Sequence, residues 1–243
     1  MASDAISDLV AARSAEIIET RRFFHGIPEL GFEENETGKA IADRLTAAGL
    51  AVETGIGKTG LVAVLEGAKP GPRLMIRADI DGLPVDELTG LDFASTNGRM
   101  HACGHDGHIT MAVTAAEILA AMKDQLAGTL IFVFQPAEEV VMGALAMIDD
   151  GLFEKYPADR VIGTHLWNQI PTGTIGVNRA TVFASADQFR LTVHGKGGHG
   201  AMPHKTIDPV AAIAEIITTA QTVVSREVPP NDMGVLTFGQ IHG

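Results

Sequence analysis

The stretch Thr129-Leu-Ile-Phe-Val-Phe134, followed at once by Gln135-Pro-Ala-Glu-Glu139, decides the fold class of this chain. A short, almost continuously apolar run is typical of a strand that is buried on both faces of a sheet. Three further runs rich in leucine or β-branched residues lie at positions 61–65, 74–76 and 161–162. The sequence therefore predicts several short, buried strands.

Helical periodicity fills the intervals between these strands. Apolar residues at helical spacing predict helices over residues 6–24, 37–50, 109–122 and 143–150. Strands that alternate with helices favour an α/β fold, with a mostly parallel central sheet flanked by helices.

The pattern changes near residue 181. Residues 189–194 alternate as a strand, residues 195–200 form a glycine-rich turn, residues 208–224 predict a helix and residues 234–238 predict another strand. We therefore expect one domain over residues 1–180 and the start of a smaller α/β domain over residues 181–243.

Composition narrows the class of protein. The chain has 243 residues, of which 46% are hydrophobic, so it can bury a substantial core. A net charge of −12 argues against a nucleic-acid partner. The single cysteine fits a reducing compartment, and neither a signal peptide nor a membrane-spanning apolar run is present in this sequence. We expect a soluble, cytoplasmic protein.

Polar groups follow three of the predicted strands, and a fourth group precedes the predicted helix over residues 109–122. Functional groups of parallel α/β sheets gather beyond the carboxyl ends of the strands. One crevice is therefore expected to collect Asp79, Asp81, Cys103, His105, Glu138, Glu139 and His165.

Cys103 and His105 are the first candidate metal ligands. They are separated by one residue, so both side chains can point to one side of an extended loop. A thiolate and an imidazole suit zinc and other borderline divalent metals. The alternative is a small buried cysteine beside a helix-capping Asp106. The crowding of histidines in this stretch favours the metal.

The adjacent pair Glu138 and Glu139 is the second candidate. Neighbouring side chains leave the backbone in different directions, so one carboxylate can bind metal while the other acts as a general base toward water. The alternative is an exposed acidic helix start, stabilised by the helix dipole.

Three further positions have weaker signals. His165 ends a strand and could simply be hydrogen-bonded. Asp79 could orient a ligand histidine from behind, or could only form a turn. The glycine-rich segment around His199 reads, on its residues alone, as a flexible hairpin turn.

Taken together, the motifs resemble those of the metal-dependent amidohydrolase and aminoacylase family, which includes hippurate hydrolase, indole-acetyl-amino-acid hydrolases and N-acetyl-diaminopimelate deacetylase. Six segments match in family order. They are Phe24-His-Gly-Ile-Pro-Glu-Leu-Gly-Phe-Glu33, Arg77-Ala-Asp-Ile-Asp-Gly-Leu-Pro84, Met100-His-Ala-Cys-Gly-His-Asp-Gly-His108, Phe134-Gln-Pro-Ala-Glu-Glu139, Thr164-His-Leu-Trp167 and Gly197-Gly-His-Gly-Ala-Met-Pro-His204.

The resemblance implies a di-metal catalytic domain over residues 1–180 and part of a lid or dimerisation domain over residues 181–243. Cys103 would bridge two divalent ions (zinc, manganese, cobalt or nickel), with His105, Glu139 and His165 as terminal ligands. Glu138 would be the general base and then acid. His199 would polarise the scissile carbonyl in the partner subunit's site, which makes a homodimer or higher homo-oligomer the expected assembly.

The resemblance also implies an activity, the hydrolysis of the amide bond of N-acyl amino acids by a metal-bound hydroxide. The chain departs from the family at its C-terminus, because the family's final ligand histidine lies in a later segment that has no match here. We therefore predict a truncated chain. Two alternatives follow, a fragment that binds metal or ligand without turnover, and an exopeptidase that cleaves dipeptides.

Overall fold

The computed structural model describes residues 2–177, 182 and 184–243. The chain divides into two compact units, Met1–Ala180 and Thr181–Gly243. The roles predicted for them, a catalytic domain and part of a lid or dimerisation domain, stay predictions.

The first unit is built on a five-stranded sheet with the strand order β1-β2-β4-β3-β5. The strands are β1 (Ala51–Ile56), β2 (Gly60–Glu66), β3 (Lys69–Asp79), β4 (Ala127–Gln135) and β5 (Arg160–Gly163). All four predicted strands of this unit form, and β1 is an additional one.

The sheet is mixed, so the prediction of a mostly parallel sheet was only partly right. β3 runs parallel to β4 and β5, whereas β1 pairs with β2, and β2 with β4, in antiparallel fashion. The cause is the length of the connections. Only residues 57–59 join β1 to β2, and only residues 67–68 join β2 to β3. A parallel connection needs a long crossover, so these short links reverse the chain.

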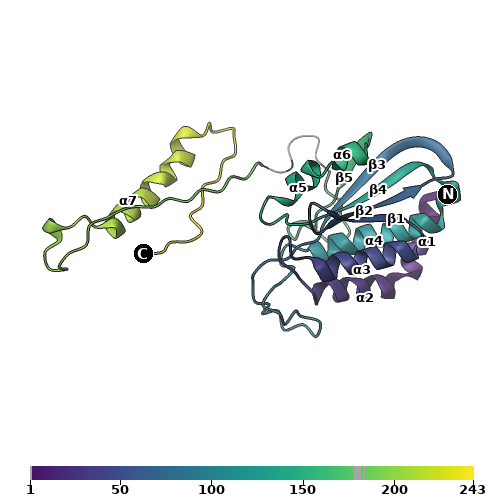
Figure 1. Ribbon diagram of the computed structural model, residues 1–243, viewed down its shortest axis with the longest axis horizontal. Helices are drawn as coiled ribbons and strands as arrows, with labels where there is room; N and C mark the ends of the chain where they lie inside the picture. Colours follow the sequence, from purple (N-terminus) through teal and green to yellow (C-terminus); the bar gives the residue numbers. More distant parts are fainter. Residues whose placement is uncertain (1, 178–181, 183) are drawn as a thin grey trace. The chain divides into compact units, whose positions relative to one another are not determined.

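Helices cover both faces of this sheet (Figure 1). On one face, α2 (Ser14–His25), α3 (Asn35–Ala47) and α4 (His105–Ala121) bury a cluster that includes Phe132 and Phe134 of β4. On the other, α5 (Gly143–Asp149) and α6 (Leu152–Lys155) pack over Ile131 and Val133 of the same strand. Successive residues of β4 therefore face opposite sides of the sheet, and helices cover both sides. This explains why residues 130–134 are all apolar.

The N-terminal helix predicted over residues 6–24 is in fact two helices, α1 (Ala2–Ala12) and α2. They are separated at Arg13, which has φ −100° and ψ 8°. The Ser14 hydroxyl donates a hydrogen bond to the Ala11 carbonyl at 2.8 Å. Such local side-chain bonds compete with the helical backbone pattern, which gives a physical reason for the break.

The second unit contains one long helix, α7 (Pro209–Thr222). Asp208 caps it, because its side chain accepts hydrogen bonds from the backbone N–H groups of Val210 and Ala211. A π-helical turn continues it over Val223–Glu227, and a short 3-10 turn spans Pro203–Lys205.

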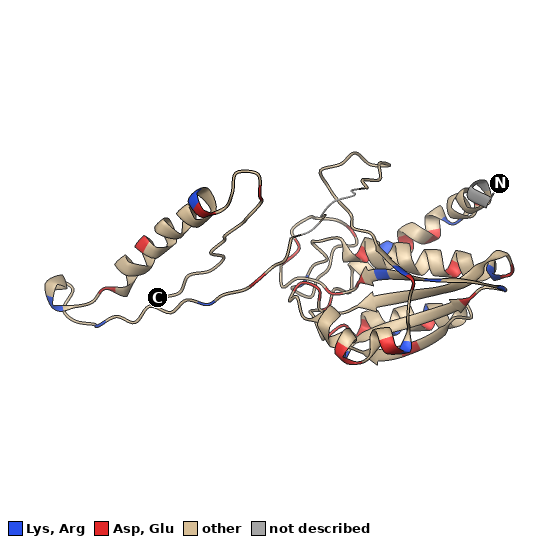
Figure 2. Cartoon of the chain, turned by 90° about the horizontal axis from the view of Figure 1, so that it is seen from above, with Lys and Arg blue, Asp and Glu red and all other residues tan. Residues whose placement is uncertain are grey.

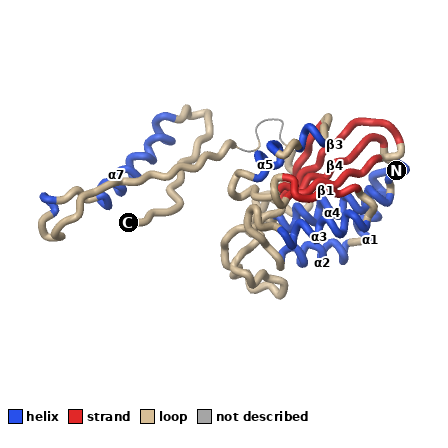
Figure 3. Tube along the Cα trace, viewed as in Figure 1, coloured by secondary structure: helices blue, strands red, loops and turns tan. Residues whose placement is uncertain are grey.

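The strands predicted at residues 189–194 and 234–238 do not form in the part of the second unit that the structure describes (Figure 3). The rings of Phe189 and Phe238 meet edge-to-face at 5.4 Å between centroids. The backbones of the two segments make no ladder, and the isolated bridge between Lys196 and Ile207 lies elsewhere. An alternating pattern becomes a strand only when a neighbouring strand supplies hydrogen bonds.

Charged residues lie mostly on helices and loops, while the central stretches of the strands carry few of them (Figure 2). In the described part of the chain, no helix is both long and apolar enough to cross a membrane.

Candidate metal centre

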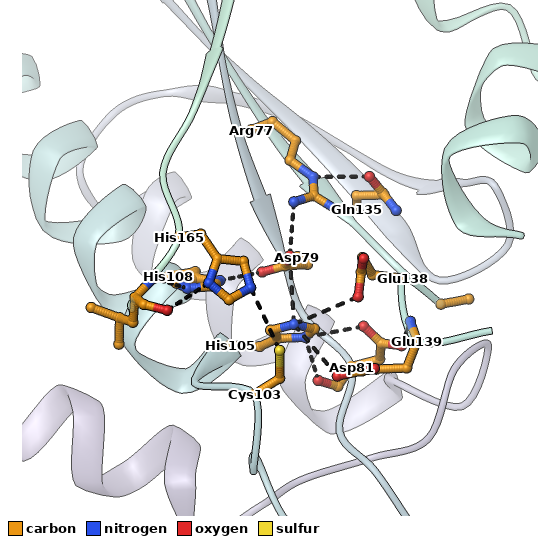
Figure 4. Close-up of polar contacts among 12 residues, drawn as sticks. Arg77, Asp79, Asp81, Cys103, His105, His108, Gln135, Glu138, Glu139 and His165 are labelled. Atoms are coloured by element: carbon orange, nitrogen blue, oxygen red, sulfur yellow. Dashed lines mark hydrogen bonds and ion pairs between the residues drawn. The ribbon is translucent and has the colours of Figure 1, made fainter. Parts of the chain in front are cut away.

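The parallel strands β3, β4 and β5 end at the same edge of the sheet. Asp79, the last residue of β3, pairs in register with Gln135, the last residue of β4, and Arg77 pairs with Gly163 at the end of β5. The side chains that follow these ends converge (Figure 4).

His105 is the first residue of α4 and its side chain is buried. It follows Gly104, whose φ of 90° lies in the left-handed region that suits glycine. Nδ1–H donates to the backbone carbonyl of Asp81 at 2.9 Å. In the neutral ring the lone pair is therefore on Nε2, and this buried atom has no hydrogen-bond partner among the described residues. A ring held in this way is typical of a metal ligand.

Cys103 and His165 approach each other on a second side of His105. His165 Nε2 lies 3.5 Å from Cys103 Sγ, and Nδ1–H of the same ring donates to the Leu166 carbonyl at 2.6 Å. The second nitrogen of His165 is thus directed toward the thiol. Sγ and the ligand nitrogens of His105 and His165 all lie within 4.8 Å of one another.

The two neighbouring glutamates differ in exposure. The side chain of Glu138 is 39% exposed and that of Glu139 is 21% exposed, and they lie 3.8 Å and 3.7 Å from His105 Nε2. The backbone N–H of Glu139 donates to Asp81 Oδ2 at 3.0 Å, and Glu139 Oε1 is buried without a hydrogen-bond partner among the described residues. Glu139 is therefore the more enclosed carboxylate of the pair, and Glu138 is the one more accessible to solvent.

Asp79 lies behind this cluster and is almost fully buried. It accepts hydrogen bonds from His108 Nδ1–H at 2.6 Å and Arg77 Nη1 at 2.8 Å, and its Oδ2 lies 3.5 Å from His105 Nε2. Burial by itself would raise the pKa of Asp79, but the His108 hydrogen bond and the neighbouring positive groups bring it well below its ordinary value. Asp79 therefore stays ionised.

His108 links two parts of the site. Its Nδ1–H donates to Asp79, and its Nε2 accepts the backbone N–H of Leu166 at 2.8 Å. Both ring nitrogens are thus committed to protein groups, so His108 ties the end of β3 to the segment after β5. Neither ring nitrogen of His108 is therefore left to bind a metal ion.

The electrostatics of the cluster favour a cation. Burial and the carboxylates of Glu139 and Glu138 raise the pKa of the Cys103 thiol to about 12. Burial likewise raises the pKa of Glu139. Burial works against a charge on His105, but the hydrogen bond and charges of Asp81 and Asp79 raise its pKa to about 9. A divalent ion would allow the thiolate and the carboxylate to ionise together.

The donor set fits such an ion. Two groups of donors share His105, one with Cys103 and His165 and one with Glu138 and Glu139, and the ligand atoms of each group lie within 4.8 Å of one another. Asp79, His105 and His108 meet the same distance criterion, but both nitrogens of His108 are already hydrogen-bonded. Mixed sulfur, nitrogen and oxygen donors suit zinc and similar divalent metals. The unpartnered His105 Nε2 and Glu139 Oε1 are the atoms that such an ion would satisfy.

The fold brings together seven of the eight predicted residues: Asp79, Asp81, Cys103, His105, Glu138, Glu139 and His165. His199 belongs to the second unit. There, its Nδ1 accepts the backbone N–H of Ala201 at 3.1 Å, so the proton of the neutral ring is on Nε2. Sequence reasoning gave no role to His108, although its position one helical turn after His105 was a usable signal.

Several known proteins are similar to this chain. The model of the family described as peptidase family M20/M25/M40 matches residues 75–243. The chain is 41% identical to the N-acyl-L-amino acid amidohydrolase of Geobacillus stearothermophilus over 242 residues, which cover 99% of this chain and 65% of the relative. The chain spans between 55% and 65% of the length of the curated relatives it matches.

Two solved structures are similar. A crystal structure from methicillin-resistant Staphylococcus aureus has a TM-score of 0.76 and 39% identity, covering 96% of this chain and 62% of that one. A dinuclear metal-binding peptidase of the M20 family from Bacillus subtilis has a TM-score of 0.65 and 40% identity, covering 69% of this chain and 47% of that one. The α/β architecture is thus shared with both.

Proposed function

Because this chain belongs to the peptidase family M20/M25/M40, we propose that it carries the metal-binding and general-base groups of an enzyme that hydrolyses the amide bond of N-acyl amino acids. The observation that carries the proposal is that the Cys103 thiol, the His165 imidazole and the carboxylates of Glu138 and Glu139 converge on His105 at one edge of the sheet. The name of the Geobacillus relative supports the substrate class.

Four residues would hold two divalent ions: Cys103, His105, Glu139 and His165. When bound, the ions would lower the pKa of water and polarise the scissile carbonyl. Asp79 and Asp81 would orient His105, since their carboxylate and carbonyl oxygens face its two ring nitrogens. His108 would keep Asp79 in place.

Glu138 would move the proton. Its carboxylate is the more exposed of the pair and is 3.8 Å from His105 Nε2, so it borders the cluster without being enclosed by it. It would take a proton from the attacking water and deliver it to the leaving nitrogen, which releases a carboxylic acid and a free amino acid.

His199 would contribute from the second unit. With its Nδ1 accepting from Ala201, it presents Nε2–H as a donor. A donor of this kind can stabilise the negative charge that develops on the carbonyl oxygen. We propose, as the family resemblance implies, that His199 does so in the partner subunit of a homodimer.

The test is Glu138→Ala, assayed for metal-dependent release of amino acid from hippurate and a panel of N-acetyl amino acids. Loss of a general base lowers the rate by about 10²–10⁴-fold. Metal content, measured by mass spectrometry, should stay at the wild-type value. Glu36→Ala, at an exposed glutamate of α3, is the matched control. A folded, metal-loaded protein that releases no amino acid from any member of the panel contradicts the proposal.

A further inference from the structure

We propose that Gly31, in the first matched motif, and Glu34, directly after it, are positioning residues for Glu138 and Glu139 and act through the backbone of Ala137. The inference rests on the proposed function of those two glutamates. It gives a role to a segment that lies between α2 and α3 and contributes no ligand to the cluster.

Ala137 has an unusual backbone. It is fully buried and has a φ of 49°, in the left-handed region that residues other than glycine rarely adopt. It directly precedes the two glutamates, so its dihedral angles set the directions in which both side chains leave the chain. Such a conformation persists only where surrounding contacts hold it.

Glu34 supplies one of these contacts across a long sequence separation. Its fully buried carboxylate accepts the Ala137 N–H through Oε1 at 2.7 Å, and Oε2 accepts a short hydrogen bond from the Thr59 hydroxyl. Among the described residues, no lysine, arginine or histidine forms an ion pair with it. Burying a carboxylate is costly, so its hydrogen bonds must offset the cost.

Gly31 supplies an independent contact. A Cβ atom at Gly31 would lie 2.9 Å from Ala137 Cα and 3.2 Å from Val140 Cγ2. The two backbones therefore approach more closely than a side chain allows. Gly31 and Glu34 thus contact the turn that carries the glutamates by two different means, one steric and one by hydrogen bonding.

The glutamates are held unequally by the remaining contacts. Glu139 has an additional anchor, because its backbone N–H donates to Asp81 Oδ2 at 3.0 Å. The backbone carbonyl of Glu138 accepts the Val141 N–H at 2.8 Å, within the same turn. A shift of Ala137 should therefore displace Glu138 more than Glu139, and catalysis more than metal binding.

The experiment compares Glu34→Ala with Glu34→Gln and Thr59→Val. The alanine variant loses the bond to Ala137. The glutamine variant keeps an oxygen acceptor at the same place, and burial already raises the pKa of Glu34, so a neutral amide suits the site. Thr59→Val removes a bond to the same carboxylate but leaves the turn untouched, which makes it the matched structural control.

We expect Glu34→Ala to lower kcat by about 10²-fold with KM little changed, since a misplacement near 1 Å can cost that much. The affinity for Co²⁺, titrated by calorimetry, should fall by about 10-fold, at the lower end for groups that orient ligands. Glu34→Gln should restore both, and Thr59→Val should change neither beyond its effect on stability. Gly31→Ala, tested in parallel, should reproduce the loss in kcat.

The inference is overturned if folded Glu34→Ala and Gly31→Ala both keep wild-type Co²⁺ affinity and wild-type kcat. It is also overturned if Glu34→Gln is as impaired as Glu34→Ala. Should the wild-type protein bind Co²⁺ without any turnover while Glu34→Ala binds it more weakly, the proposed function fails and the positioning of Glu139 stands. If Glu34→Ala does not fold, Gly31→Ala and Glu34→Gln decide the question.

Discussion

The two units of the chain hold their candidate functional histidines in different ways. In the first unit His105 is buried and its ring is oriented by Asp81, which reaches it from the end of β3. In the second unit the ring of the exposed His199 is oriented by Ala201, only two residues along the chain. One arrangement depends on the whole sheet, and the other depends on a local turn.

The same contrast extends to the core. The first unit buries two apolar clusters on opposite faces of its sheet. Over residues 182 and 184–243, by contrast, no side chain is buried. Long-range contacts therefore determine the geometry of the candidate metal centre, whereas the cap of helix α7 and the orientation of the His199 ring rest on contacts between residues close in sequence.

Removing one large apolar side chain from each unit tests whether only the first unit has a buried core. Phe132→Ala removes a fully buried ring from the centre of β4 and should lower the free energy of unfolding by about 3–5 kcal/mol. Ile216→Ala, on the partly exposed side of α7, should cost less than about 1 kcal/mol. Urea denaturation followed by circular dichroism measures both. Equal losses would show that the second unit has a core of its own.

This contrast also explains what could be predicted from sequence. Strands β2, β3 and β4 were predictable because each contains an apolar run that the fold buries at least in part. β5 formed as predicted although its four residues are exposed, and β1 was missed because Ala51–Ile56 is not an apolar run. The strands predicted at residues 189–194 and 234–238 have the right pattern, but a pattern does not supply a hydrogen-bonding partner. Helix α7 was predictable because its N-cap and its apolar periodicity are both local.

The candidate metal centre likewise has features that could be predicted from the sequence and features that could not. That these ligand candidates would gather was predictable, since Glu139 and His165 follow the ends of parallel strands that share one edge, and Cys103 and His105 lie where a loop enters helix α4. The direction of the antiparallel strands was missed, because it depends on where short connections reverse the chain. The role of Glu34 could not be predicted, because its partner Ala137 is 103 positions away and contributes only a backbone N–H.

A second prediction concerns pH and the metal. The pKa of His105 is raised to about 9, so at neutral pH a metal must displace a proton from this ring. The affinity of the site for a divalent metal should therefore fall as pH falls. Displacing one proton costs about tenfold per pH unit, so the loss should be at least about 100-fold from pH 9 to pH 7. The Cys103 thiol, with its pKa raised to about 12, adds to this slope.

Calorimetry in two buffers with different heats of ionisation measures both the affinity and the number of protons released. His204→Ala, at an exposed histidine of the second unit, should leave the affinity and its pH dependence unchanged. An affinity that does not vary between pH 7 and pH 9 would mean that His105 is not a ligand.

The N-cap of helix α7 allows a mild perturbation that is confined to the second unit. Asp208 caps α7 by accepting hydrogen bonds from Val210 and Ala211, at 2.9 Å and 3.3 Å. Asp208→Ala should reduce the stability of this helix by about 1 kcal/mol, while Asp208→Asn should retain most of it, because the amide oxygen can still accept these bonds. Hydrogen exchange at the amides of α7 reads out the change, and the amides of α4 should exchange as before. If the amides of α4 also lost protection, the helix in the second unit would be coupled to the sheet, and its stability would not be local.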